Sequence, residues 1–204
     1  TPKTKMLILC SPSNPTGSVY SQEELDKLAA IICNHEDLYV LADEIYEHIN
    51  YIGKHASIAR AKGMKERAII VNGVSKAYAM TGWRIGYIAA PEWIVKGCNK
   101  LQGQYTSGPC SVSQKAAEAA YTLDQGCVEE MRQAFERRRN LIVELAKAIP
   151  GLEVNVPEGA FYLFPKCSSF FGKSDGITTI GNSTDLAMYL LEKGHVATVG
   201  GDAF

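Results

Sequence analysis

Two short apolar runs around one lysine constrain the fold of this chain more than any other feature. Residues 68–71 (Ala-Ile-Ile-Val) and 85–90 (Ile-Gly-Tyr-Ile-Ala-Ala) are short and rich in β-branched or aromatic side chains. Such runs predict buried strands. The loop between them carries Ser75, Lys76 and Arg84. Because open α/β sheets place their ligands at the carboxyl ends of parallel strands, we expect this loop to form part of a ligand site.

The three polar side chains of this loop favour one kind of ligand. A lone lysine is usually a solvated surface charge, so Lys76 by itself carries little weight. The Ser75 hydroxyl and the planar fork of Arg84 are suited to phosphate. A nucleophilic amine beside two phosphate-binding groups suggests a phosphorylated aldehyde held as a Schiff base, and pyridoxal 5'-phosphate is the obvious candidate.

The segment from Gly73 to Gly86 (GVSKAYAMTGWRIG) resembles the cofactor attachment signature of class I aminotransferases, the pyridoxal-phosphate enzymes of fold type I. The resemblance implies that Lys76 forms the Schiff base and that Ser75 and Arg84 bind the phosphate. It also implies the fold of aspartate aminotransferases: an α/β large domain with a mostly parallel sheet, then an α+β small domain. The sequence from Ser75 to Arg84 resembles that of the bacterial aspartate aminotransferase branch.

Two other expected strands also end in polar residues. Residues 6–10 precede a turn-rich segment that contains Asn14, and residues 38–42 precede Asp43 and Tyr46. Composition alone leaves Asn14 in a loop and Asp43 as a helix N-cap. Resemblance to the family's Asn-Pro-Thr-Gly and Asp-Glu-Ile-Tyr motifs implies that Asn14 and Tyr46 bind the phenolic oxygen. It also implies that Asp43 holds the pyridine nitrogen protonated, through a bond worth about 1.5–3 kcal/mol. Glu44 is expected to be structural.

The remaining elements predict two domains, residues 1–148 for cofactor binding and residues 149–204 as a truncated small domain. A capping box at residues 21–24 starts a helix that runs to about residue 35. Later patterns predict helices at 91–101, 112–123, 128–149 and 184–193, a loop at 102–109, and strands at 152–156, 160–164 and 196–199. The long third helix is expected to bridge the domains. We expect His48, Asn50 and His55 at the surface, and Phe161 and Tyr162 in the core.

Composition narrows the range of partners. The 204 residues are 46% hydrophobic and 21% charged, with a formal net charge of −1. This balance favours neither nucleic acid nor an anionic membrane, and no apolar run approaches the roughly 18 residues of a spanning helix. The six cysteines form no C-x-x-C pair and no histidine stands at ligand spacing from them. We therefore expect reduced thiols, no metal site and a cytoplasmic protein.

The resemblance implies transamination between an amino acid, aspartate first, and a 2-oxo acid. Lys76 would be displaced by the substrate amine and then act as general base and acid. The family also implies a homodimer, and this chain resembles only about the middle half of it. We expect a fragment that lacks the N-terminal phosphate loop, the stacking aromatic and the C-terminal carboxylate-binding arginine. Such a fragment should bind cofactor weakly and turn over poorly.

Two alternatives stay open at this point. The same fold hosts carbon–sulfur lyases and aminocyclopropane-forming enzymes, which share groups like Lys76 and Asp43. A pyridoxal-phosphate-binding regulatory module without turnover is the other. The complete set of cofactor residues argues against a dead site but does not exclude a regulator.

Overall fold

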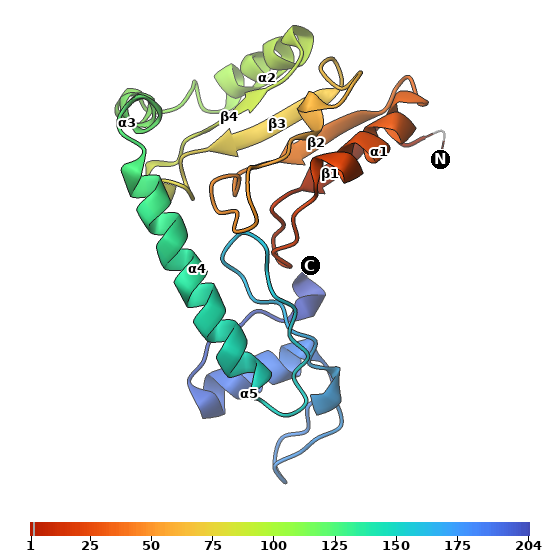
Figure 1. Ribbon diagram of the computed structural model, residues 1–204, viewed down its shortest axis with the longest axis vertical. Coiled ribbons are helices and arrows are strands. Elements are labelled where there is room, and N and C mark those ends of the chain that lie inside the picture. The colour runs from red at the N-terminus through yellow and green to blue at the C-terminus, as the bar shows by residue number, and fades with distance from the viewer. Residues whose placement is uncertain (2) are drawn as a thin grey trace.

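A four-stranded sheet forms the upper part of the molecule (Figure 1). The computed structural model describes residue 1 and residues 3–204. The strands are β1 (Met6–Cys10), β2 (Tyr39–Asp43), β3 (Ala68–Gly73) and β4 (Gly86–Ala89), in the order β1-β2-β3-β4. The first three are parallel and β4 is antiparallel to β3. The predicted, mostly parallel sheet is confirmed.

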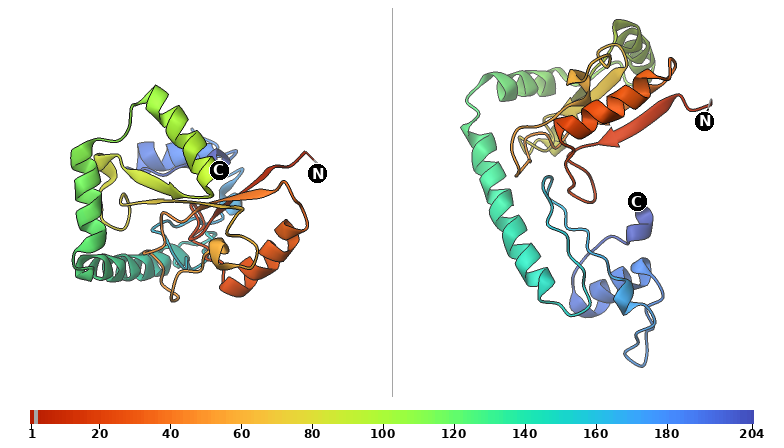
Figure 2. Two further views of the ribbon diagram at one scale, coloured as in Figure 1. Left: turned by 90° about the horizontal axis from the view of Figure 1, so that it is seen from above. Right: turned by 45° about the vertical axis from the view of Figure 1, so that its right-hand side comes forward.

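One helix and a short turn cover one face of this sheet (Figure 2). Helix α1 (Gln22–Cys33) begins at a complete capping box, in which Ser21 and Glu24 satisfy each other's backbone N–H groups. Its buried residues Leu25 and Ile32 pack with Val40 of β2 and with the 3-10 turn η1 (Ile58–Arg60). This core holds the parallel strands in register, which fixes the position of the loops at their carboxyl ends.

Three further helices follow the sheet in the sequence. They are α2 (Glu92–Tyr105), α3 (Ser111–Thr122) and α4 (Gly126–Lys147), with a 3-10 turn η2 (Thr81–Trp83) before β4. The loop predicted at residues 102–109 is wrong in its first half, because α2 continues to Tyr105. The helix ends where Ser107 and Gly108 adopt positive φ values of 62° and 136°. Helix α4 runs from the sheet to the C-terminal part (Figure 1).

The C-terminal part contains fewer strands than predicted. It holds α5 (Ser183–Gly194) and the 3-10 turns η3 (Ser168–Phe170) and η4 (Gly201–Ala203). The strands predicted at 152–156, 160–164 and 196–199 are wrong: the described residues there form only isolated bridges, such as that between Glu153 and Lys166. A strand needs a continuous partner, and Ala160 with φ 56° leaves the extended conformation. The domain boundary stays a prediction.

Among the described residues, we find no helix with the length and apolar character that a membrane crossing requires.

Candidate cofactor site

The carboxyl ends of β1, β2 and β3 meet at one edge of the sheet. Cys10, Asp43 and Val71 are in register across the three strands. The loops that leave this edge carry Asn14 after β1 and Lys76 after β3. Parallel pairing therefore brings together side chains that are far apart in the sequence, as the predicted strands require.

Tyr46 is at the centre of this site. Its side chain is buried, and its Oη lies 2.6 Å from Tyr162 Oη. Asn14 Nδ2 donates a hydrogen bond to the same Tyr162 Oη at 3.4 Å. Burial raises the pKa of Tyr46 well above its usual range, and the hydrogen bond to Tyr162 adds to the effect. Tyr46 is therefore a neutral hydroxyl at neutral pH.

Lys76 faces two aromatic rings. Its Nζ lies 5.9 Å from the ring centroid of Tyr46 and 5.8 Å from that of Phe161. Across residues 1 and 3–204, no carboxylate lies within ion-pair distance of this amine. A half-buried amine without an acidic partner is unusual for a structural lysine.

The backbone around Lys76 is set by a close approach of β3 and β4. A Cβ built on Gly73 would lie 2.9 Å from Gly86 Cα and 3.0 Å from Ile85 O. Only glycine fits there, and the buried Val74 that follows fixes the start of the lysine turn. The glycine and the buried valine thus determine where Lys76 leaves the sheet.

One oxygen of Asp43 caps the turn that follows β2. Its Oδ1 accepts a hydrogen bond from the backbone N–H of Ile45 at 3.1 Å, as in a cap of the following turn. Its other oxygen forms no hydrogen bond with the described part of the chain and remains available to a donor. Burial raises the pKa of the neighbouring Cys10 thiol, and the charge of Asp43 contributes to this shift.

Ser75 and Arg84 are connected through Thr81. The Thr81 hydroxyl donates to Ser75 O at 3.0 Å, and Arg84 Nη1 donates to Thr81 O at 2.9 Å. Arg84 is exposed and has a positive φ of 53°. The guanidinium keeps most of its donors free, but it does not contact the Ser75 hydroxyl. Their shared role in binding phosphate therefore stays a prediction.

The aromatic pair Phe161 and Tyr162 is the part of the site that the sequence prediction missed. Both were expected in the core. Tyr162 does pack against a buried cluster that includes Tyr46, whereas Phe161 is 38% exposed and faces Lys76. Phe161 stacks on Phe135 of α4 with a centroid separation of 5.2 Å. The available signal was the Pro-Glu-Gly-Ala-Phe-Tyr segment, which resembles a family motif but gave no role for either ring.

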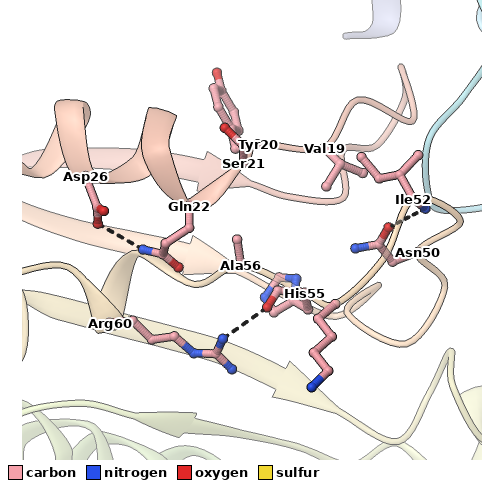
Figure 3. A pocket seen from close by; sticks show the side chains of 11 residues that line it. Val19, Tyr20, Ser21, Gln22, Asp26, Asn50, Ile52, His55, Ala56 and Arg60 are labelled. Atoms are coloured by element: carbon pink, nitrogen blue, oxygen red, sulfur yellow. Dashed lines mark hydrogen bonds between the residues drawn. The ribbon is translucent and has the colours of Figure 1, made fainter.

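A second polar cluster lies behind the turn that carries Tyr46. Glu44 is buried, accepts from Ser57 Oγ at 2.6 Å and lies 2.9 Å from His55 Nε2. The surface positions predicted for His55 and Asn50 are wrong: the side chain of His55 is 10% exposed and Asn50 is buried. Both line a pocket beside α1 (Figure 3). The His55 imidazole packs inward against Glu44, because a buried carboxylate needs polar partners.

Glu44, Glu47 and His55 bring atoms of metal-ligand type within 4.8 Å of one another. The carboxylates already have partners: Ser57 and His55 contact Glu44, and Asn72 Nδ2 donates to Glu47 Oε1 at 2.8 Å. These contacts account for the cluster as a structural network that holds the turn after β2.

Comparison with known proteins defines the class to which this fold and site belong. Residues 1–204 match the family described as aminotransferase class I and II. The chain belongs to this family, whose cofactor is pyridoxal 5'-phosphate. The predicted resemblance is thereby confirmed.

The relatives include a bifunctional aspartate aminotransferase and glutamate/aspartate-prephenate aminotransferase of Petunia hybrida, 50% identical, covering 100% of this chain and 44% of the relative. The aspartate aminotransferase of Pinus pinaster is 50% identical, covering 98% of this chain and 42% of that relative. The crystal structure of the Rhizobium meliloti aspartate aminotransferase superposes with a TM-score of 0.94 at 44% identity, over 100% of this chain and 52% of that chain. The chain thus spans about half the length of the relatives it matches.

The side chains at the sheet edge fit the family's cofactor. An amine without an acidic partner suits an aldehyde, and the free oxygen of Asp43 suits a ring N–H. The amide of Asn14 and the hydroxyl of Tyr46 supply hydrogen bonds for a phenolic oxygen. The chemistry of this donor set therefore matches the group.

Proposed function

We propose that this protein transfers an amino group from an amino acid to a 2-oxo acid, with pyridoxal 5'-phosphate held at Lys76. The observation that carries the proposal is the amine of Lys76, which has no acidic partner in the described part of the chain and faces Tyr46 at the carboxyl edge of the sheet. Aspartate is the proposed amino donor, because the relatives from Petunia hybrida, Pinus pinaster and Rhizobium meliloti carry aspartate in their names.

Six residues would hold the cofactor. Lys76 would bind its aldehyde carbon, and Asp43 would hold its ring nitrogen. The others are Asn14 and Tyr46 for the phenolic oxygen, and Ser75 and Arg84 for the phosphate. When bound, the cofactor supplies an electron sink that stabilises negative charge at the substrate Cα.

Lys76 would also move the proton on which the reaction depends. Once the substrate amine has taken its place, the Nζ of Lys76 is free to remove the proton from the substrate Cα. The rings of Tyr46 and Phe161 border this amine and limit its contact with water. Asp43 would hold the ring nitrogen during this transfer.

Assembly and location follow as further parts of the proposal. We expect two copies to form a homodimer that works in the cytoplasm. The net charge of −1 is consistent with a protein that needs no nucleic acid or membrane partner.

Borohydride trapping tests the proposal directly. The purified chain is mixed with pyridoxal phosphate, its visible spectrum is recorded, and the adduct is reduced and mapped by mass spectrometry. We expect one predominant labelled peptide, containing Lys76, and loss of that label in Lys76→Ala. Lys65→Ala, which removes an exposed lysine, should keep it.

The reaction class is tested on the loaded protein. Amino acids are supplied with a 2-oxo acid, and both products are quantified. Amino-group transfer without release of ammonia supports an aminotransferase, whereas ammonia or a cleaved carbon–sulfur bond would assign a lyase. In the borohydride experiment, label spread over many surface lysines would refute the assignment of Lys76.

A further inference from the structure

Tyr162 connects two groups of the candidate site that lie far from it in the sequence. Its hydroxyl contacts Tyr46 across 116 residues and Asn14 across 148 residues. Its ring packs edge-on against Tyr46 with a centroid separation of 5.7 Å, and tilted against Phe161 at 4.8 Å. The ring is therefore held from two sides, and its hydroxyl is directed at the site.

When an acceptor binds, the number of hydroxyl hydrogens decides which tyrosine donates to the other. Either hydroxyl can be the donor while the two contact only each other. An acceptor-only oxygen held by Asn14 and Tyr46 takes the single hydroxyl hydrogen of Tyr46. The 2.6 Å contact then needs its hydrogen from Tyr162. Asn14 has two N–H groups, one for Tyr162 and one for the bound oxygen.

We propose that Tyr162 is a positioning residue, whose hydroxyl orients that of Tyr46 toward a bound acceptor oxygen. The inference rests on the proposed function, in which that oxygen is the phenolic oxygen of the cofactor. It adds Tyr162, next to Phe161 in the segment after α4, to a site whose other polar groups lie at the carboxyl edge of the sheet. The hydrogen bonds run from Asn14 to Tyr162, then to Tyr46, and end on the ligand.

The two distances show which contact dominates. The 2.6 Å contact between the hydroxyls is short, whereas the 3.4 Å contact from Asn14 is near the limit for a hydrogen bond. A ligand oxygen can therefore compete for the amide of Asn14 without breaking the contact between the tyrosines. Hydrogen bonds in such a chain polarise one another, so a donor to Tyr46 strengthens its bond to the ligand.

A double-mutant cycle tests the proposal, using Tyr162→Phe, Tyr46→Phe and the double variant. Cofactor affinity is measured by titration of the visible absorbance, and the pH dependence of that absorbance is recorded. We expect Tyr162→Phe to weaken binding about 3- to 10-fold, the range of one neutral hydrogen bond. In the Tyr46→Phe background the same change should cost less than about twofold, because Tyr162 acts through Tyr46.

Tyr51→Phe is the matched control. This substitution also removes one hydroxyl, which donates a hydrogen bond to Ala160 O in the same segment. Among the described residues, the Tyr51 hydroxyl has no hydrogen bond with Tyr46 Oη. It should leave cofactor affinity within about twofold. Equal losses from Tyr162→Phe in both backgrounds would overturn the proposal, since they indicate general structural damage. Tighter binding would also overturn it, because the hydroxyl would then be a competitor.

A cofactor-free cycle separates this inference from the proposed function. The same variants are unfolded in urea without cofactor, and the coupling between Tyr46 and Tyr162 is read from the midpoints. A measurable coupling supports the contact even if the unsubstituted chain fails to bind cofactor, which would refute the proposed function instead. Additive midpoints would overturn the contact itself.

Discussion

At the scale of residues, the candidate site contains polar groups whose partners are incomplete. Among the residues that the structure describes, Lys76 has no acidic partner and one oxygen of Asp43 has no donor, although both residues are partly buried. Groups like these cost free energy in the folded state unless a ligand completes them. Resemblance to family motifs singled out both residues, and their roles toward the cofactor stay predictions. Tyr162 could not be found this way, since an aromatic residue after a turn is more often part of a core.

Asp43→Asn isolates the charge at this position. The amide keeps an oxygen that can accept from Ile45 N–H, so the turn should survive with little change in the urea midpoint. A charge-assisted bond is worth about 1.5–3 kcal/mol, so we expect cofactor affinity to fall about tenfold or more. Absorbance titration of both proteins measures the difference.

Asp37→Asn is the control for Asp43→Asn. Asp37 is exposed and pairs with Lys5 at 2.6 Å, away from the carboxyl edge of the sheet. Its substitution should leave cofactor affinity unchanged. Equal affinity of the Asp43→Asn variant and the unsubstituted chain would exclude Asp43 as the partner of the ring nitrogen.

At the scale of elements, local signals predicted the sheet and the helices well. Capping residues and apolar periodicity are properties of the segment itself, so α1 and the four strands were found with small errors at their ends. The C-terminal strands failed for the opposite reason, because a strand exists only if a partner lies beside it. Ala160 instead donates its N–H to Ile49 O, which joins the segment to the turn after β2.

The loop after β1 meets the C-terminal segment at Gly17. Its carbonyl accepts from the N–H groups of both Glu158 and Gly159 at 2.9 Å. A Cβ here would lie 2.5 Å from Pro157 Cβ, and the φ of +72° already disfavours a side chain. We expect Gly17→Ala to lower the free energy of unfolding by about 2–4 kcal/mol, measured by urea denaturation.

Gly172→Ala separates the collision from the backbone strain. Gly172 has a similar positive φ, of +82°, but no atom of the described residues lies within 4 Å of its Cβ position. Its substitution should cost clearly less than that of Gly17. Similar losses at both positions would mean that the collision with Pro157 adds nothing to the cost of the substitution.

At the scale of the whole molecule, several large apolar side chains are exposed to solvent. Trp93, Leu101 and Tyr105 of α2 are 62%, 63% and 84% exposed, and their spacing in multiples of four places them along one side of the helix. Ile8 on the outer strand β1 is 71% exposed. Surfaces of this kind mark contacts with further protein. A contact of this kind depends on the partner surface, so the local sequence pattern of α2 could not predict it.

We expect the 204-residue chain to self-associate through this side of α2. Size-exclusion chromatography with light scattering should show a mass that rises with concentration. The double substitution Leu101→Lys and Tyr105→Lys should shift the chain toward the monomer, because two buried charges would oppose the contact.

Ile177→Lys is the comparison for the α2 variant. Ile177 is 87% exposed but lies in the 172–180 loop, away from α2. It should leave the mass unchanged. A monomer at every concentration of the unsubstituted chain, or an equal effect of both variants, would show that α2 is not the contact.

The bond between Asn14 and Tyr162 has a consequence for the order in which the molecule folds. The sheet joins strands that are consecutive in the sequence, whereas this bond closes a loop of 148 residues. The entropy lost on closure grows with loop length, so we expect the sheet to form before Asn14 and Tyr162 meet. We therefore expect the cofactor site to be completed late in folding. Cofactor binding would then report that the segment with Tyr162 has docked, and not only that the sheet has formed.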